Sequence, residues 1–287
     1  MRDDAAIRAL PDDHAVPGDF RVAIEDGCIL VWRDDLEAEV RRVAADPDAL
    51  DVADVSGRAP LGRIEVPGQR ALLVRPYRKG GMLRGVRGAR FHGRLRPLDE
   101  LTLHAELQQR GVGVLDVAGA VVRGDTSGWE GWLITREEAD AVDLAAWLDG
   151  ADTAGHDDPA TTLERAGRVV RELHDEGVAH PDLHPKNLLL TREGTVLVLD
   201  LDRAGMDHEP LPSRPRLANL ARFERSLEKQ REKGRALARW DGAAFYRGYG
   251  GEDGPRWQAD ALARRGSLAL RKLWWGIIGE TRRGGAS

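Results

Sequence analysis

The chain has 287 residues, 32% of them charged, and a formal net charge of −5 at pH 7. This length accommodates one large domain or two lobes, and the acidic balance gives no overall case for nucleic-acid binding. No run of 18 apolar residues exists and the N-terminus lacks a basic segment followed by an apolar one, which excludes a membrane-spanning helix and predicts no signal peptide.

The N-terminal part of the chain is predicted to be rich in strands. Residues 1–19 are acidic and contain prolines, which indicates a loose tail. From residue 20 to residue 32 apolar positions alternate on both sides of Asp26-Gly27, a pattern typical of a β-hairpin. The only cysteine, Cys28, excludes an internal disulfide and fits a reducing, cytoplasmic compartment.

A helix, a loop and a second strand region follow. We expect a short helix over Leu36–Ala45 and a loop over Asp46–Asp54. The segment from Gly57 to Gly62 is a candidate phosphate-covering loop, because small residues let backbone N–H groups approach phosphate oxygens. An ordinary turn is the alternative. The apolar strand Ala71–Arg75 comes next and ends in a cation.

A basic, glycine-rich stretch follows this strand without an interrupting acid. Its cations are Arg75, Arg78, Lys79, Arg84, Arg87, Arg90, Arg94 and Arg96. A charge run of this kind is usually solvated surface. Arginine also recognises carboxylates and phosphates with two parallel hydrogen bonds, so an anionic ligand is the functional interpretation.

The predicted N-lobe is completed by one helix and two further strands. Apolar spacing predicts a helix over Pro97–Arg110, which Gly111 can end. Val112–Val122 and Trp129–Thr135 are predicted strands of a small sheet. The polar residues 136–138 then form the expected hinge between two lobes.

The second part of the chain is predicted to be mainly helical. Asp143–Leu148 is expected to form a short helix and Gly150–Pro159 a polar loop. Thr161-Thr162-Leu163-Glu164 matches a capping box, and the apolar positions after it predict a helix that Gly177 ends.

The stretch Val178–Asp202 carries the most specific chemical pattern. Two short apolar runs joined by Glu193-Gly194 predict a hairpin that brings Asp182, Asn187 and Asp200 to one point. One carboxylate can position a hydroxyl nucleophile, while an amide and a second carboxylate hold Mg²⁺ on nucleotide phosphates. The pattern therefore indicates phosphoryl transfer, with a solvated loop as the alternative.

This stretch resembles the protein-kinase catalytic loop H-R-D-L-x-x-x-N, with D-L-D in place of the metal-binding D-F-G. The segment R-P-Y-R-K-G-G, Arg75–Gly81, is similar to the R-H-Y-R-R-G-G signature of the bacterial lipopolysaccharide core kinases. Those enzymes phosphorylate 3-deoxy-D-manno-octulosonic acid (Kdo) or heptose. The resemblance also includes Gly57-Arg58, Glu100, Asp200–Ala204, Asn219–Arg222, Ser226–Lys229 and Tyr246–Tyr249.

The resemblance implies an α+β, bilobal protein-kinase-like fold, with a small antiparallel-sheet N-lobe over residues 20–135 and a mainly helical C-lobe over 136–287. It implies that ATP–Mg²⁺ binds in the cleft and that the γ-phosphoryl group moves to a sugar hydroxyl, that of Kdo on the lipid A inner core. A kinase for another small molecule, such as an aminoglycoside, and a catalytically inert kinase-like binding module are the alternatives.

The resemblance also implies roles in the C-lobe. Asp182 orients the acceptor hydroxyl and accepts its proton, and Asn187 and Asp200 hold the metal. Asp202 either joins the metal shell or holds the loop. His184 either contacts the transferring phosphoryl group or is a hydrogen-bonded loop histidine, and His180 is a structural brace.

In the N-lobe the resemblance implies a set of nucleotide and acceptor contacts. Arg75 replaces the usual strand lysine, with Lys79 as the alternative, and Glu100 pairs with this cation, with Glu106 as its competitor. The remaining implied contacts are Gly57 and Gly62 to phosphate, Glu137 and Glu138 through backbone groups to adenine, and Arg84, Arg87 and Arg90 to the anionic glycolipid.

The C-terminal stretch from Ala261 to Arg283 combines Leu, Ile and Trp residues with flanking arginines. It is too short to span a bilayer, but Trp beside basic residues is typical of an interfacial helix. A helix that packs its apolar face on the second lobe is the alternative. We therefore expect a cytoplasmic protein, with peripheral contact to the cytoplasmic face of the inner membrane left open.

Overall fold

The computed structural model describes residues 16–33, 35–53, 61–77, 90–125, 127–151, 158–207 and 209–266. The chain divides into two compact units. Unit 1 comprises Met1–Ala139 together with Leu201–Ala204, and unit 2 comprises Asp140–Asp200 with Gly205–Ser287.

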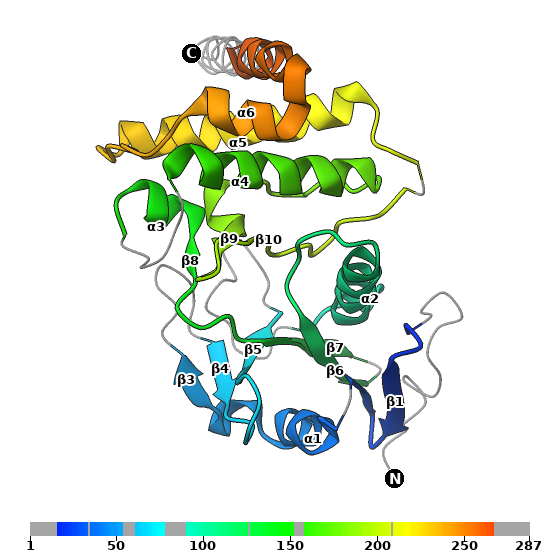
Figure 1. The fold of residues 1–287 in the computed structure, drawn as a ribbon. Coiled ribbons are helices and arrows are strands. Elements are labelled where there is room, and N and C mark those ends of the chain that lie inside the picture. Colours follow the sequence, from blue (N-terminus) through cyan, green and yellow to red (C-terminus); the bar gives the residue numbers. More distant parts are fainter. Residues whose placement is uncertain are drawn as a thin grey trace, which may run out of the picture. The chain divides into compact units, whose positions relative to one another are not determined.

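Unit 1 is built on an antiparallel sheet with the strand order β1-β2-β6-β7-β5-β4-β3 (Figure 1). Its strands are β1 (Phe20–Glu25), β2 (Cys28–Arg33), β3 (Asp51–Ala53), β4 (Leu61–Ile64), β5 (Leu72–Pro76), β6 (Val117–Asp125) and β7 (Gly128–Arg136). Two helices, α1 (Glu37–Ala45) and α2 (Arg96–Gln109), accompany the sheet. The predicted β1–β2 hairpin is present, and both residues of its turn, Asp26 and Gly27, have positive φ.

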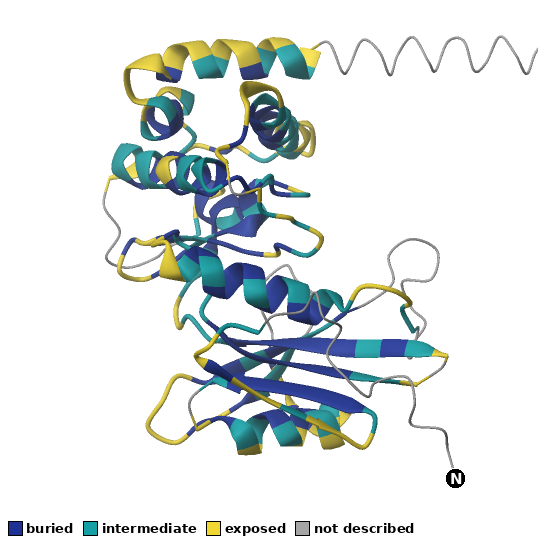
Figure 2. Cartoon of the chain, turned by 90° about the vertical axis from the view of Figure 1, so that its right-hand side faces the viewer, coloured by how far each residue is buried: buried dark blue, intermediate teal, exposed yellow. Residues whose placement is uncertain are grey.

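The two faces of the sheet carry separate apolar cores. Leu30 and Trp32 pack in one core with Val40 of α1, whereas Ile29 and Val31 pack in the other with Leu98 of α2. Successive side chains of a strand point to opposite faces, so a strand covered on both sides has to be apolar throughout. This is why the central strands are buried along most of their length (Figure 2).

The predicted loop at Asp46–Asp54 is wrong in part. It contains a short 3-10 helix, η2 (Pro47–Ala49), and the strand β3, which pairs with β4. The sequence of β3 has no alternating pattern, and Val52 is 72% exposed. Pairing with β4 rather than local propensity therefore creates this strand.

Unit 2 is mainly helical and contains a small sheet with the strand order β10-β9-β8. Its helices are α3 (Leu144–Leu148), α4 (Pro159–Asp175), α5 (Ser213–Glu232) and α6 (Gly242–Gly250), with 3-10 turns η4 (Pro185–Asn187) and η5 (Gly251–Asp253). Its strands are β8 (Val142–Asp143), β9 (Leu188–Leu190) and β10 (Val196–Val198). Residues 254–266 are helical as well.

The capping box predicted at Thr161 is wrong, because α4 begins earlier. Asp158 is the N-cap residue, and its carboxylate accepts hydrogen bonds from the backbone N–H groups of Ala160 and Thr161. Pro159 occupies the first turn, where its fixed φ suits a helix start and its missing N–H is not needed.

The C-terminal amphipathic stretch is described only in part. Its first residues belong to the helix at 254–266, and residues 267–287 lie outside the described residues. Within the described part of the chain, no helix is both long and apolar enough to cross a membrane.

Candidate active site

The predicted catalytic loop, which runs from Val178 to Asn187 in unit 2, starts where α4 ends. Gly177 has φ +77°, and the N–H of Val178 donates to the carbonyl of Leu173. A Cβ at Gly177 would lie 1.8 Å from the carbonyl oxygen of Asp207, so only glycine fits this turn. This turn therefore fixes the direction in which the chain leaves α4 and enters the loop.

The predicted hairpin is present and brings its polar residues together. Leu188, Leu189 and Leu190 pair antiparallel with Val198, Leu197 and Val196. At the open end of this hairpin, the N–H of Leu199 donates to the carbonyl of Asn187 over 2.9 Å. The side-chain amide of Asn187 donates to the carbonyl of Asp182 over 3.1 Å. Asp200 follows Leu199 directly and has φ 57°, a left-handed conformation that Asp tolerates better than most residues.

The carboxylate of Asp182 faces solvent and has two basic neighbours. It is 62% exposed, accepts a hydrogen bond from Arg222 Nη1 over 3.1 Å, and lies 3.5 Å from His184 Nε2. An exposed ion pair contributes little stability, so these contacts orient the carboxylate. Arg222 comes from α5 and lies in the segment Asn219–Arg222, which the resemblance includes but to which no role was assigned.

His180 is a buried brace of the loop. Its Nε2–H donates to the carbonyl of Leu199 over 2.8 Å, and its Nδ1 accepts the N–H of Asp182 over 3.0 Å, which assigns the neutral tautomer. Burial lowers the pKa of His180, against an opposing hydrogen bond to the Leu199 carbonyl. The ring thus ties the two ends of the catalytic hairpin together as a neutral group.

A buried polar chain behind His180 was not found from the sequence. The side chain of Asn219 on α5 accepts the N–H of His180 and donates to its carbonyl, over 2.8 Å and 3.1 Å. The ring of His174 on α4 contacts this Asn219 oxygen through Nε2 and the hydroxyl of Tyr249 on α6 through Nδ1. Three helices therefore converge on the backbone of the catalytic loop.

In unit 1, Arg75 and Glu100 form the ion pair expected from the sequence. Arg75 Nη2 lies 2.6 Å from Glu100 Oε2, and the Glu100 side chain is 1% exposed. The hydroxyl of Tyr77 donates to the same carboxylate, and His104 Nε2 lies 3.8 Å from it. Burial alone would raise the pKa of Glu100, but Arg75, His104 and Tyr77 together lower it to about 2.

Asp202, the third candidate metal ligand, is engaged elsewhere. Arg96 of α2 donates to both of its carboxylate oxygens, with Nε 2.7 Å from Oδ1. This contact favours the second of its two expected roles, that of holding the loop.

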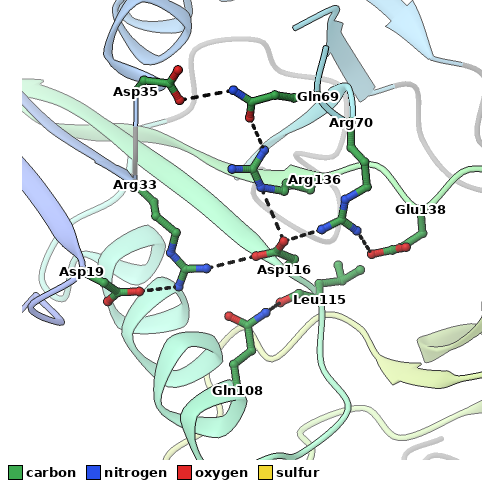
Figure 3. A network of polar contacts seen from close by, with 10 residues as sticks. All are labelled: Asp19, Arg33, Asp35, Gln69, Arg70, Gln108, Leu115, Asp116, Arg136 and Glu138. Carbon is green, nitrogen blue, oxygen red and sulfur yellow. Dashed lines mark hydrogen bonds and ion pairs between the residues drawn. The ribbon is translucent and has the colours of Figure 1, made fainter. Parts of the chain in front are cut away.

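The expected hinge residues are held by one backbone hydrogen bond and by their side chains. The N–H of Glu137 donates to the carbonyl of Ala71 over 2.7 Å, and its carboxylate accepts a hydrogen bond from Arg63. Glu138 pairs with Arg70. Arg70 also forms an ion pair with Asp116 (Figure 3). The carboxylate of Asp116 pairs with three guanidinium groups in all, those of Arg33, Arg70 and Arg136.

Of the remaining predicted phosphate and acceptor contacts, the structure describes two. Gly62 lies in β4, where a Cβ would come within 2.8 Å of the Leu50 side chain, so its missing side chain serves packing. Arg90 donates to Ser127 and pairs with Asp125. The remaining candidates, Gly57, Lys79, Arg84 and Arg87, lie outside the described residues.

The donors of unit 2 fit a magnesium ion that a nucleotide brings with it. Within the described ranges, no three His, Cys, Asp or Glu side chains form a metal-holding group. Asn187 and Asp200 supply an amide and a carboxylate oxygen. Mg²⁺ is commonly held by one or two carboxylates together with waters and substrate phosphates, rather than by an all-protein cage.

Comparisons with known proteins agree with this geometry. The model of the lipopolysaccharide kinase (Kdo/WaaP) family matches residues 55–249. A 3-deoxy-D-manno-octulosonic acid kinase of Xylella fastidiosa (strain M12) is 33% identical over 164 residues, which is 55% of this chain and 62% of the relative. The kinase of the same name from Xanthomonas campestris pv. campestris (strain B100) is 32% identical over 182 residues, 62% of this chain and 70% of the relative.

A solved structure has the same fold. The structure described as WaaP in complex with acyl carrier protein has a TM-score of 0.54 and 21% identity, and the match covers 84% of this chain and 98% of that chain. Together with the antiparallel sheet of unit 1 and the helical unit 2, this likeness confirms the predicted α+β, protein-kinase-like fold.

Proposed function

The chain belongs to the lipopolysaccharide kinase (Kdo/WaaP) family, and from this premise we propose that it transfers the γ-phosphoryl group of ATP to a hydroxyl group of Kdo on the lipid A inner core. Two hydrogen bonds carry the proposal. The side chain of Asn187 donates to the carbonyl of Asp182, and the N–H of Leu199, the neighbour of Asp200, donates to the carbonyl of Asn187. Relatives named as Kdo kinases support the choice of acceptor.

Asp182 is the residue that receives the acceptor hydroxyl. Its exposed carboxylate can accept a hydrogen bond from a sugar hydroxyl and take the proton as the bond to phosphorus forms. Arg222 and His184 both contact the Asp182 carboxylate and orient it. When protonated, His184 also adds positive charge next to the transferring phosphoryl group.

Asn187 and Asp200 would hold Mg²⁺, which when bound neutralises phosphate charge. The backbone bonds of the hairpin, including the one from the Leu199 N–H to the Asn187 carbonyl, hold the chain next to both proposed donors and support this proposal. Phosphoryl transfer depends mainly on such positioning, so the rigid hairpin is what the reaction requires of this part of the chain.

Arg75 takes the place of the usual strand lysine as the phosphate-contacting cation, oriented by Glu100. A guanidinium group can offer one edge to Glu100 and another to a phosphate, because its donors form a fork. Lys79 remains the alternative. For the acceptor, Arg84, Arg87 and Arg90 are the proposed contacts to its carboxylates and phosphates.

The test is transfer from labelled ATP to Kdo-lipid A, with an aminoglycoside and a protein mixture as competing acceptors. Asp182→Ala should lower the rate of transfer by orders of magnitude and keep ATP–Mg²⁺ binding, because it removes only the contact to the acceptor. Asp200→Ala should lower both the rate of transfer and the affinity for ATP–Mg²⁺. Both positions lie on loop backbone at the ends of strands, so neither change should unfold the protein.

Undiminished turnover in Asp182→Ala would contradict the catalytic assignment. Labelling of the aminoglycoside alone would identify a different small-molecule kinase. ATP binding without transfer to any acceptor would indicate a kinase-like binding module.

A further inference from the structure

A chain of contacts in unit 1 runs from the segment after Asp200 to the buried ion pair. Asp202 is held by Arg96, the first residue of α2, through both carboxylate oxygens. The guanidinium carbon of Arg96 lies 5.1 Å from the ring centre of Tyr77. Tyr77 in turn donates its hydroxyl to Glu100, the partner of Arg75.

The pair between Arg96 and Asp202 is better organised than a typical surface ion pair. The two side chains are only 16% and 17% exposed, and the ring of Phe91 lies 5.0 Å from the same guanidinium group. Stacking on two aromatic rings fixes the plane of the guanidinium fork, so little side-chain entropy remains to be lost when it binds a carboxylate. Arg94 and Asp99, at the same end of α2, form an exposed counterpart in which the arginine is 79% exposed.

The backbone around Asp202 needs such an anchor. Asp200 and Arg203 have φ values of 57° and 66°, so a left-handed residue stands on each side of the Leu201-Asp202 pair. Non-glycine residues adopt this region only at an energetic cost, and they persist there only where the surroundings hold them. The described anchors are the buried side chain of Leu201, the bond from the Ala204 N–H to the Leu201 carbonyl, and the contact to Arg96.

Asp202 is poorly suited to bind the metal itself. Its two oxygens already accept charge-assisted hydrogen bonds from a fixed guanidinium group. Turning them to Mg²⁺ would break these bonds and leave a partly buried positive charge next to the cation.

We propose that Arg96 and Asp202 are a positioning pair, which anchors Leu201–Ala204 and thereby sets the backbone conformation of the metal-binding Asp200, while Asp202 does not touch the metal. Asp200 directly precedes the anchored segment, so freeing that segment lets Asp200 leave its left-handed conformation. The inference rests on the proposed function in that Asp200 is taken as the Mg²⁺ ligand.

The test compares Arg96→Gln, Asp202→Asn and the exchanged double variant Arg96→Asp/Asp202→Arg, with Arg94→Gln as the matched control. Hydrogen–deuterium exchange of the amides of residues 201–204, without nucleotide, reports the anchor itself. Calorimetric ATP binding over a series of Mg²⁺ concentrations reports the metal site, and thermal melting reports global folding.

Each single change should speed amide exchange at residues 201–204 by about tenfold or more, because it removes the anchor of a strained segment. Each should also raise the Mg²⁺ concentration for half-saturation by about tenfold, the usual order for loss of a residue that orients a ligand. The double variant should recover most of both losses, and Arg94→Gln should match the wild type.

Two results would overturn the inference. In one, Asp202→Asn loses Mg²⁺-dependent binding while Arg96→Gln retains it, which would make Asp202 a metal ligand. In the other, the exchange rates stay at the wild-type level in both single variants. If Arg96→Gln fails to fold, Arg96→Lys keeps the charge without the fork and should show intermediate values of both readouts. A failure of Kdo phosphorylation would leave these measurements intact, since none of them uses the acceptor.

Discussion

At the scale of single residues, His174 is a buried titratable group whose neutral form the fold selects. Its side chain is fully buried and both ring nitrogens have neutral partners, Tyr249 and Asn219. Burial lowers its pKa to about 4, although the hydrogen bond that its Nε2–H donates to the Asn219 side-chain oxygen and the carboxylate of Asp175 act in the opposite direction. A proton on this ring would also face the guanidinium group of Arg216.

This residue should make the stability of the protein depend on pH below neutrality. In the unfolded chain a histidine has its ordinary pKa of about 6.5, so between pH 6.5 and 4 the unfolded state binds more protons. The stabilisation is complete above pH 6.5 and is lost as the pH falls towards 4, by about 3 kcal/mol in the free energy of unfolding. His180 acts in the same direction, because its pKa is also lowered.

Urea unfolding between pH 7 and pH 4.5 measures this effect. His174→Gln should flatten the dependence, whereas His92→Gln, at an exposed position, should keep the wild-type slope. The lowered pKa of Glu100 affects stability only below about pH 4.5, so it does not enter this window. An unchanged slope in His174→Gln would show that the buried ring is not the titrating group.

At the scale of elements, α4 and α6 approach closely at two glycines. A Cβ at Gly167 of α4 would lie 1.9 Å from the carbonyl oxygen of Phe245, and a Cβ at Gly248 of α6 would lie 1.9 Å from that of Glu164. No side-chain rotation relieves a clash with backbone, so any larger residue has to separate the helices. The contact matters for the site because α4 leads directly into the catalytic loop.

Gly248→Ala should therefore lower the free energy of unfolding by about 1–3 kcal/mol, the range for overpacked cores. Gly266→Ala is the matched control, since a Cβ there meets nothing within 4 Å. Chemical denaturation of the two variants beside the wild type gives the comparison. Equal stability of Gly248→Ala would mean that the two helices can move apart at no cost.

At the scale of the whole molecule, attachment to a membrane surface is the property that the proposed acceptor requires. Kdo-lipid A presents its sugar at a lipid surface, so the enzyme needs a weak and reversible contact there. The C-terminal sequence offers Trp274 and Trp275 beside Arg271 and Lys272. Each basic residue near anionic lipid contributes roughly 1 kcal/mol, and the attraction is screened by salt.

We predict that the protein sediments with anionic liposomes at low salt and is released at high salt. Arg271→Glu/Lys272→Glu should reduce this binding and leave transfer to a delipidated sugar acceptor unchanged, because it alters only the attachment. Absence of co-sedimentation at low salt would assign the tryptophans to packing within the protein.

Local sequence patterns were enough to predict the order of the main elements and the residues of the candidate site. Asp182, Asn187 and Asp200 lie within one short stretch, and the strands β9 and β10 between them are defined by apolar runs and the Gly194 turn. Local spacing is enough to position such residues, because a hairpin has few possible registers. The pair between Arg75 and Glu100 was expected as well, but from the resemblance to kinases rather than from local spacing, and Lys79 and Glu106 were its alternatives.

The distant groups that hold the site in place could not be predicted in the same way, because they meet only in the folded chain. Arg96 and Asp202 are 106 residues apart in the sequence, Arg222 and Asp182 are 40 apart, and Asn219 and His180 are 39 apart. With 43 basic and 48 acidic residues in the chain, no local pattern selects one ion pair over another. The packing of the elements decides which of these groups meet. Burial then distinguishes the pair of Arg96 and Asp202, which is largely removed from water, from the exposed pair of Arg222 and Asp182.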